Sequence, residues 1–168
     1  MKKKPTVYLD TSIISAYWFE GADVAMLARR LHTREWWELE KPHFALWTSA
    51  FGEAELRAGA FARQPDCLKM VQRLRYLSVT VAVPQLIEEI MRRKLVPPNK
   101  TGDAAHLAIA AADSIDFLLT WNYAHMANPI VQARFDTLCA AKGLVAPLLV
   151  SPESMPQVRF GQSIRRKR

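Results

Sequence analysis

Three acidic residues stand where carboxylates can do chemistry. Asp10 directly follows a short apolar stretch, Glu55 lies in a run typical of a helix, and Asp103 lies at the start of a run of small residues. Three carboxylates that converge at one edge of a sheet repel one another unless a cation lies between them. Ligation by oxygen atoms, with no cluster of cysteines nearby, indicates Mg²⁺ or Mn²⁺ rather than zinc. An ion held in this way activates water for attack on a phosphodiester.

Each carboxylate also has an ordinary interpretation. Asp10 and Asp103 can cap or charge-stabilise the helices that begin beside them, and Glu55 can be an exposed helical charge. The combination of all three is better explained by one site. Glu53 lies two residues from Glu55, roughly 200° around a helix, so only one of the two can face the same edge.

The elements that must position these residues alternate along the chain. Strands are predicted at residues 6–9, 44–48, 117–120 and 148–150, and helices at about 12–18, 22–40, 50–59, 66–76, 84–95, 103–112 and 129–142. Residues 79–83 are rich in β-branched side chains and predict either a short strand or an extended connector, and Pro84 fits the first helical position. The alternation predicts an α/β fold, a three-layer α/β/α sandwich around a mostly parallel sheet. We expect one domain over residues 1–150 and a basic C-terminal tail over residues 151–168.

Parallel strands bring their carboxyl ends to one edge, where ligands bind in α/β sheets. Asp10 follows the first strand and is expected at that edge. Asp116 precedes the third predicted strand and is expected at the opposite edge. His106 lies one helical turn after Asp103 and can share its face, although a buried, hydrogen-bonded histidine is the more ordinary interpretation.

Several function classes are not supported by motifs. The chain contains no GxGxxG or GxxxxGK[ST] phosphate loop and no GxSxG elbow, and Asp10 has no second aspartate two residues later. The two cysteines, Cys67 and Cys139, lack metal-binding spacing and predict a reducing, cytoplasmic setting. Since no apolar run has the length of a membrane span and no signal-peptide pattern follows the first lysines, no membrane partner is expected.

The formal net charge of +7 is concentrated at the two ends of the chain. Three lysines at positions 2–4 and five basic residues at positions 159–168 account for it, because the remaining 15 basic residues face 16 acidic ones. Basic ends of this kind can bind a polyanion such as RNA through phosphate contacts, or can simply keep the protein soluble.

Four short runs, taken in order, resemble motifs of the PIN domain family, which includes the toxin ribonucleases of VapBC-type toxin–antitoxin pairs. They are YLDTS at 8–12, ELRAG at 55–59, DAAHLAIA at 103–110 and LLTWN at 118–122. The resemblance covers about residues 5–150. The runs TREWW at 33–37 and TWNYAH at 120–125 are similar to one PIN-like subgroup rather than to the compact toxins.

The resemblance implies an endoribonuclease that depends on Mg²⁺ or Mn²⁺, with Asp10, Glu55 and Asp103 as metal-binding catalytic acids. Asn122 would lie at the edge of the site, and Thr11 and Thr120 would orient neighbouring groups or phosphate. It also implies a homodimer and a small antitoxin protein that blocks the site.

One position departs from the family pattern. Many members carry a fourth acid three residues after the asparagine, and here that position is His125. A histidine can bind a metal or contact phosphate, but a second Mg²⁺ site would lose an anionic ligand. The alternative is therefore a catalytically degenerate PIN-like scaffold that binds RNA or a protein partner without cleavage, and a DNA-directed nuclease is a third possibility. Trp36 and Trp37 could stack on bases, although aromatic residues at helical positions usually lie in a core or a dimer interface.

Overall fold

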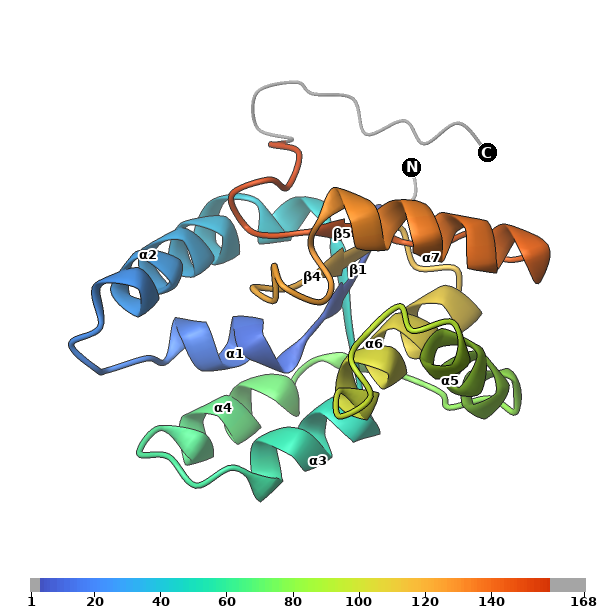
Figure 1. Cartoon of the computed structure of the whole chain (residues 1–168). Coiled ribbons are helices and arrows are strands. Elements are labelled where there is room, and N and C mark those ends of the chain that lie inside the picture. The colour runs from blue at the N-terminus through green and yellow to red at the C-terminus, as the bar shows by residue number, and fades with distance from the viewer. Residues whose placement is uncertain (1–3, 158–168) are drawn as a thin grey trace.

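The computed structural model describes residues 4–157, and its strands form one sheet. All neighbouring strands are parallel, and their order is β3-β2-β1-β4-β5. The strands are β1 Thr6–Leu9, β2 Ala45–Ser49, β3 Arg75–Leu77, β4 Phe117–Leu119 and β5 Leu148–Val150. The helices are α1 Thr11–Tyr17, α2 Val24–Leu39, α3 Ala50–Ala58, α4 Gln64–Val71, α5 Ala82–Arg92, α6 Thr101–Ala112 and α7 Pro129–Ala141, with a short 3-10 helix η1 at Lys41–His43 (Figure 1). The predicted α/β fold is confirmed.

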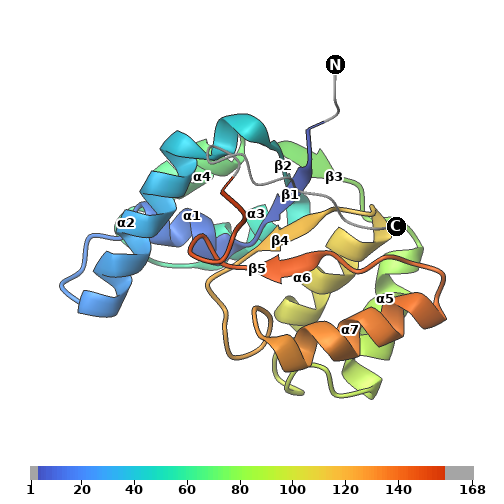
Figure 2. The same ribbon diagram turned by 90° about the horizontal axis from the view of Figure 1, so that it is seen from above.

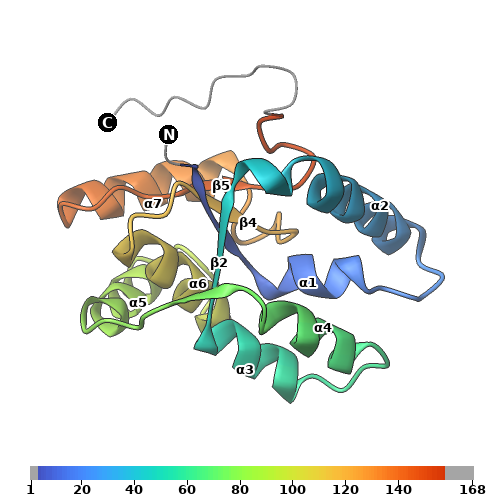
Figure 3. The ribbon, with the colours of Figure 1, turned by 180° about the vertical axis from the view of Figure 1, so that it is seen from behind.

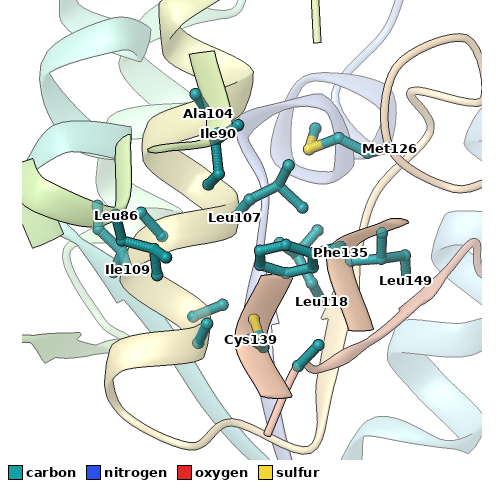
Figure 4. Close-up of a cluster of buried hydrophobic side chains, with 14 of the residues drawn as sticks. Leu86, Ile90, Ala104, Leu107, Ile109, Leu118, Met126, Phe135, Cys139 and Leu149 are labelled. Carbon is teal, nitrogen blue, oxygen red and sulfur yellow. The ribbon is translucent and has the colours of Figure 1, made fainter. Parts of the chain in front are cut away.

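Helices cover both faces of the sheet, as the three-layer prediction requires. Side chains alternate along β1, so Tyr8 packs with α5, α6 and α7, whereas Val7 and Leu9 pack with α1, α2 and α4. Figure 2 shows the first group of helices on one side of the strands, with α1 and α2 on the other. Figure 4 shows the first core, where Leu107 of α6 and Phe135 of α7 gather with Leu118 of β4.

Local sequence signals explain where several helices begin and end. The Ser49 hydroxyl accepts a hydrogen bond from the N–H of Gly52 and so caps α3, directly after β2. Asn128 caps α7 in the same way, and Pro129 occupies the first turn. Gly143 has φ 69° just past the end of α7, a conformation that favours glycine. The predicted end of this helix is confirmed.

The prediction of a helix over residues 66–76 is wrong in its second half. α4 ends at Val71, and Arg75–Leu77 form β3, the edge strand that pairs only with β2. An edge strand with an exposed Arg75 lacks the apolar pattern of the central strands, so its sequence reads as a helix end. Residues 79–83 do not form a strand, and α5 begins at Ala82 rather than at Pro84. Proline fits the third position because the first helical N–H groups have no partner within the helix.

The helices α3 and α4 lie side by side, with α1 next to α4 (Figure 3). Residues 151–157 follow β5 and rest on the domain, where Ser151 and Met155 are buried. The basic residues of the predicted tail at 159–168, and the lysines at 2 and 3, lie outside the described residues. Among the helices described here, none combines the length and the apolar character needed to cross a membrane.

Candidate active site

Asp10 leaves β1 at the carboxyl edge of the sheet, and its carboxylate is buried. Its backbone N–H donates to the carbonyl of Leu119 in β4, so the residue is fixed between the two central strands. The side chain makes no capping hydrogen bond to α1. Instead, Oδ2 accepts hydrogen bonds of 2.6 Å from both the Ser12 and the Thr120 hydroxyls. The Asp10 side chain therefore does not act as a helix cap, which was its ordinary interpretation.

Glu55 comes to the same edge from α3, in the helix capped by Ser49. The Thr11 hydroxyl lies 3.2 Å from Glu55 Oε2 and 3.3 Å from Asp10 Oδ1, so it bridges the two carboxylates. A Cβ atom at Gly102 would lie only 2.7 Å from Glu55 Oε1, which means that this carboxylate rests against the backbone of α6. The side chain of Glu55 is 34% exposed and therefore reachable from solvent.

Glu53 points elsewhere, as the helical spacing predicts. Its carboxylate accepts hydrogen bonds from the Tyr76 hydroxyl at 2.6 Å, from Gln72 at 3.0 Å and from Arg57 at 2.6 Å. These three bonds, the one from Tyr76 first, lower the pKa of Glu53 to about 2. Asp116 also lies where it was expected: it accepts the N–H and the hydroxyl of Thr6, the first residue of β1, at the opposite edge.

His106 of α6 completes a group with the two carboxylates. Its Nε2 lies 2.7 Å from Glu55 Oε2 and 3.3 Å from Asp10 Oδ1, and ligand atoms of these three residues all lie within 4.8 Å of one another. Its Nδ1 lies 2.8 Å from the Tyr8 hydroxyl, which in turn lies 2.8 Å from Ser49 Oγ. A buried hydrogen-bonded histidine was the ordinary expectation, and His106 is buried. The sequence did not indicate its contact with both carboxylates.

The charges around His106 favour its protonated form. Burial alone lowers the pKa of the imidazole, but the negative charges of Asp10 and Glu55, the hydrogen bond to Glu55 and the charge of Asp103 together raise it above its ordinary value. Burial raises the pKa of Tyr8 strongly, so its phenol stays protonated. A protonated His106 can therefore hold the two carboxylates together as an internal cation.

Asp103 lies one turn before His106 on α6 and belongs to a second set of contacts. Its Oδ2 accepts a 3.0 Å hydrogen bond from Asn122 Nδ2 and lies 3.0 Å from His125 Nδ1. Asn122 Oδ1 accepts the N–H of His125 at 3.0 Å. The structure thus brings Asp10 and Glu55 together with His106, whereas Asp103 is held beside them by Asn122 and His125.

The Thr120 hydroxyl connects the two sets. It donates to Asp10 Oδ2 and accepts the backbone N–H of Asn122 at 3.0 Å. Thr120 is fully buried, so this bridge is shielded from water. The predicted positioning residues Thr11 and Thr120 both contact the carboxylates directly.

The donor set is chemically suited to a divalent cation. The two carboxylates offer oxygen ligands that suit Mg²⁺ or Mn²⁺, and the His106 nitrogen can add a ligand for Mn²⁺ once its proton is lost. The close approach of Glu55 to Gly102 leaves its carboxylate facing Asp10 and His106. No known protein-family model matches this sequence, and no curated protein sequence is significantly similar to it.

Proposed function

We propose that the protein is a PIN-like endoribonuclease that hydrolyses RNA phosphodiesters with the help of Mg²⁺ or Mn²⁺. The observation that carries the proposal is the group Asp10–Glu55–His106, whose ligand atoms lie within 4.8 Å of one another at the carboxyl edge of a parallel sheet. Asp103 adds a third carboxylate beside this group. The residues of this acidic group come from the same short sequence runs that resemble PIN-family motifs, which supports the proposal.

The residues of the chain have distinct roles in this proposal. Asp10, Glu55 and Asp103 would hold the cation, which supplies Lewis-acid activation of water and neutralises charge on the phosphate. Ser12 and Thr120 fix Asp10 in one orientation by donating two short hydrogen bonds. Without a cation, the negative charge of the site carboxylates repels the phosphates of RNA. RNA cleavage would therefore require the cation.

The central test is cleavage of RNA oligonucleotides with Mn²⁺ or Mg²⁺. Asp10→Asn keeps the size of the side chain and should reduce cleavage by several orders of magnitude while the fold is retained. Asp116→Asn is the matched control, because it makes the same change at the opposite edge of the sheet. Wild-type rates in Asp10→Asn would refute the assignment. Equal losses in both variants would indicate damage to the fold instead.

Calorimetric titration with Mn²⁺ and Mg²⁺ tests the cation separately. Binding by the wild type that disappears in Asp103→Asn would support Asp103 as a ligand despite its contacts with Asn122 and His125. Binding that is unchanged in Asp103→Asn but lost in Asp10→Asn would restrict the site to the group around His106.

A second candidate function is favoured by one observation. His106 Nε2 contacts both Asp10 and Glu55, so a protonated imidazole can neutralise them without any metal. In that case the protein is a degenerate PIN-like scaffold that binds RNA or a protein partner. Strong cation-dependent cleavage that appears only in His125→Asp would support the scaffold, whereas cleavage by the wild type would exclude it. A DNA oligonucleotide of the same sequence distinguishes an RNA-directed from a DNA-directed enzyme.

The partners implied by the resemblance belong to the same proposal: a homodimer, and a small antitoxin as in VapBC-type pairs. Large apolar residues on α2 support a protein contact, since Val24 is 80% and Leu31 is 65% exposed. Cys67 and Cys139 are both buried and are not joined in a disulfide, which suits a cytoplasmic setting. Light scattering of the purified protein tests the dimer, and growth arrest on expression of the wild type but not of Asp10→Asn tests the toxin role.

A further inference from the structure

A cavity of about 520 Å³ opens beside the candidate site, between the segment that follows α5 and the start of α7. These elements belong to the layer formed by α5, α6 and α7 (Figure 2). Its wall is mostly apolar, and Leu95, Val96, Pro97, Ile130 and Val131 contribute to it. Its volume lies within the range of small-molecule sites, roughly 300–1,000 Å³.

The charges at this cavity have one sign. Lys94 and Arg134 line it, and the described residues that form its lining include no acid. Arg134 is held in place because its Nη2 donates a 2.6 Å hydrogen bond to the carbonyl of Arg93. The N-terminal end of α7, a helix of 13 residues, also lies at the cavity through Asn128 and Pro129 and adds partial positive charge. An anion with an apolar part is the ligand that fits these features.

His125 joins the cavity to the candidate site. It lines the cavity, while its Nδ1 lies 3.0 Å from Asp103 Oδ2. A chain bound at Asp103 can therefore continue past His125 into the cavity. Among the described lining residues, no other side chain forms a hydrogen bond or an ion pair with a site carboxylate.

We propose that this cavity binds one nucleotide of the RNA substrate, next to the phosphodiester at the candidate site. The base and ribose lie against the apolar wall, and a phosphate lies between Lys94 and Arg134. The proposal rests on the proposed ribonuclease function for the identity of the ligand. It adds to that function a binding site that requires neither the cation nor the acidic group.

Two substitutions perturb the cavity with little risk to the fold. Ile130 is 73% exposed, so Ile130→Glu places a negative charge in the lining without emptying the core. Lys94 has φ 53°, a conformation that favours glycine, so Lys94→Gly removes a cation and relaxes the backbone. The matched controls are Val145→Glu, at an exposed position beyond the far end of α7, and Lys69→Ala on α4, in the opposite layer.

The test measures binding of the four ribonucleoside 5′-monophosphates to the full chain, without divalent cations, by equilibrium dialysis or NMR titration. We expect saturable binding by the wild type and both controls. Ile130→Glu and Lys94→Gly should weaken it at least about tenfold, which corresponds to roughly 1.4 kcal/mol. Unphosphorylated nucleosides and inorganic phosphate alone should each bind more weakly than the nucleotides.

Three results would overturn the proposal: no saturable binding of any nucleotide, equal affinities in the cavity variants and their controls, or inorganic phosphate binding as tightly as the nucleotides. Asp10→Asn should bind nucleotides like the wild type, because Asp10 is not part of the cavity lining. Nucleotide binding by a protein that cleaves no RNA would reject the ribonuclease and keep the cavity. If no nucleotide binds and both cavity variants cleave RNA at wild-type rates, the nucleotide site is rejected and the ribonuclease function is kept.

Discussion

The contact between Gly102 and Glu55 allows the geometry of the site to be changed without touching an acidic residue. A Cβ at position 102 would lie 2.7 Å from Glu55 Oε1, whereas ordinary contacts begin at 3.4 Å, so in Gly102→Ala the carboxylate must retreat by about the difference. The next neighbour, Phe51 Cζ, is 3.8 Å away and imposes no further shift. Misplacement of a catalytic group by about 1 Å can cost of the order of 10²-fold in rate. We therefore expect cleavage to fall by roughly 10- to 100-fold.

The same substitution should leave the fold intact or strengthen it. Gly102 lies in the first turn of α6, and alanine is favoured over glycine in helices by up to about 1 kcal/mol. Urea denaturation measures the effect of Gly102→Ala on stability. Cleavage rates and Mn²⁺ affinity measure its effect on the site. Gly59→Ala is the control outside the site, since its Cβ would crowd the ring of Phe61, an exposed side chain, at 2.8 Å and would lie at an ordinary 3.5 Å from the carbonyl of Leu56. Wild-type rates and metal affinity in Gly102→Ala would refute the role given to Glu55.

Four further predictions follow from single residues. Tyr8→Phe removes the hydroxyl that contacts His106 and should lower the free energy of unfolding by about 1–3 kcal/mol in urea denaturation. Asp116→Ala should destabilise by about 1–2 kcal/mol but keep wild-type cleavage per folded molecule; a lost activity would contradict its structural role. Glu53 has a pKa of about 2 rather than 4.5, so Glu53→Gln should be less stable than the wild type at pH 7, and the gap should shrink as the pH falls from 4.5 towards 2. Burial raises the pKa of Cys67 to about 11, so its thiol should resist alkylation at pH 8 until the protein is denatured, and rapid labelling of native protein would argue against this burial.

Strong local signals made most of the fold predictable. The strands β1, β4 and β5 are short apolar runs, and the predicted residues coincide with the observed ones within one position. The edge strand β3 was missed because Arg75 is exposed and Tyr76 is only partly buried, so its sequence lacks a continuous apolar run. Its pairing depends on contacts between residues about 28 positions apart, such as Trp47 with Arg75, which local patterns do not encode.

The candidate site was only partly predictable, for a reason that lies in α6. All eight residues from 104 to 111 are buried, so this helix has no polar face that would show which way each side chain points. Spacing placed Asp103 and His106 one turn apart, but only the packed helix shows that His106 contacts Asp10 and Glu55. Asn122 and His125 were predicted to belong to the site. Their polar contacts with Asp103 depend on the path of the loop after β4, which local sequence patterns do not encode.

The topology of the sheet explains why the site lies where it does. The chain runs from β1 outward through β2 to β3, and then returns to the other side of β1 to form β4 and β5. The connections that leave β1 and β4 therefore diverge: α1 packs on one face of the sheet, and the segment after β4 leads to α7 on the other. A crevice at such a reversal of strand order is where α/β sheets bind ligands. Asp10 follows β1 and Thr120 follows β4 on the two sides of this reversal, and the Thr120 hydroxyl connects them by donating to Asp10 and accepting the N–H of Asn122. Because Asn122 in turn donates a hydrogen bond to Asp103, both sets of carboxylate contacts meet where the strand order reverses between β1 and β4.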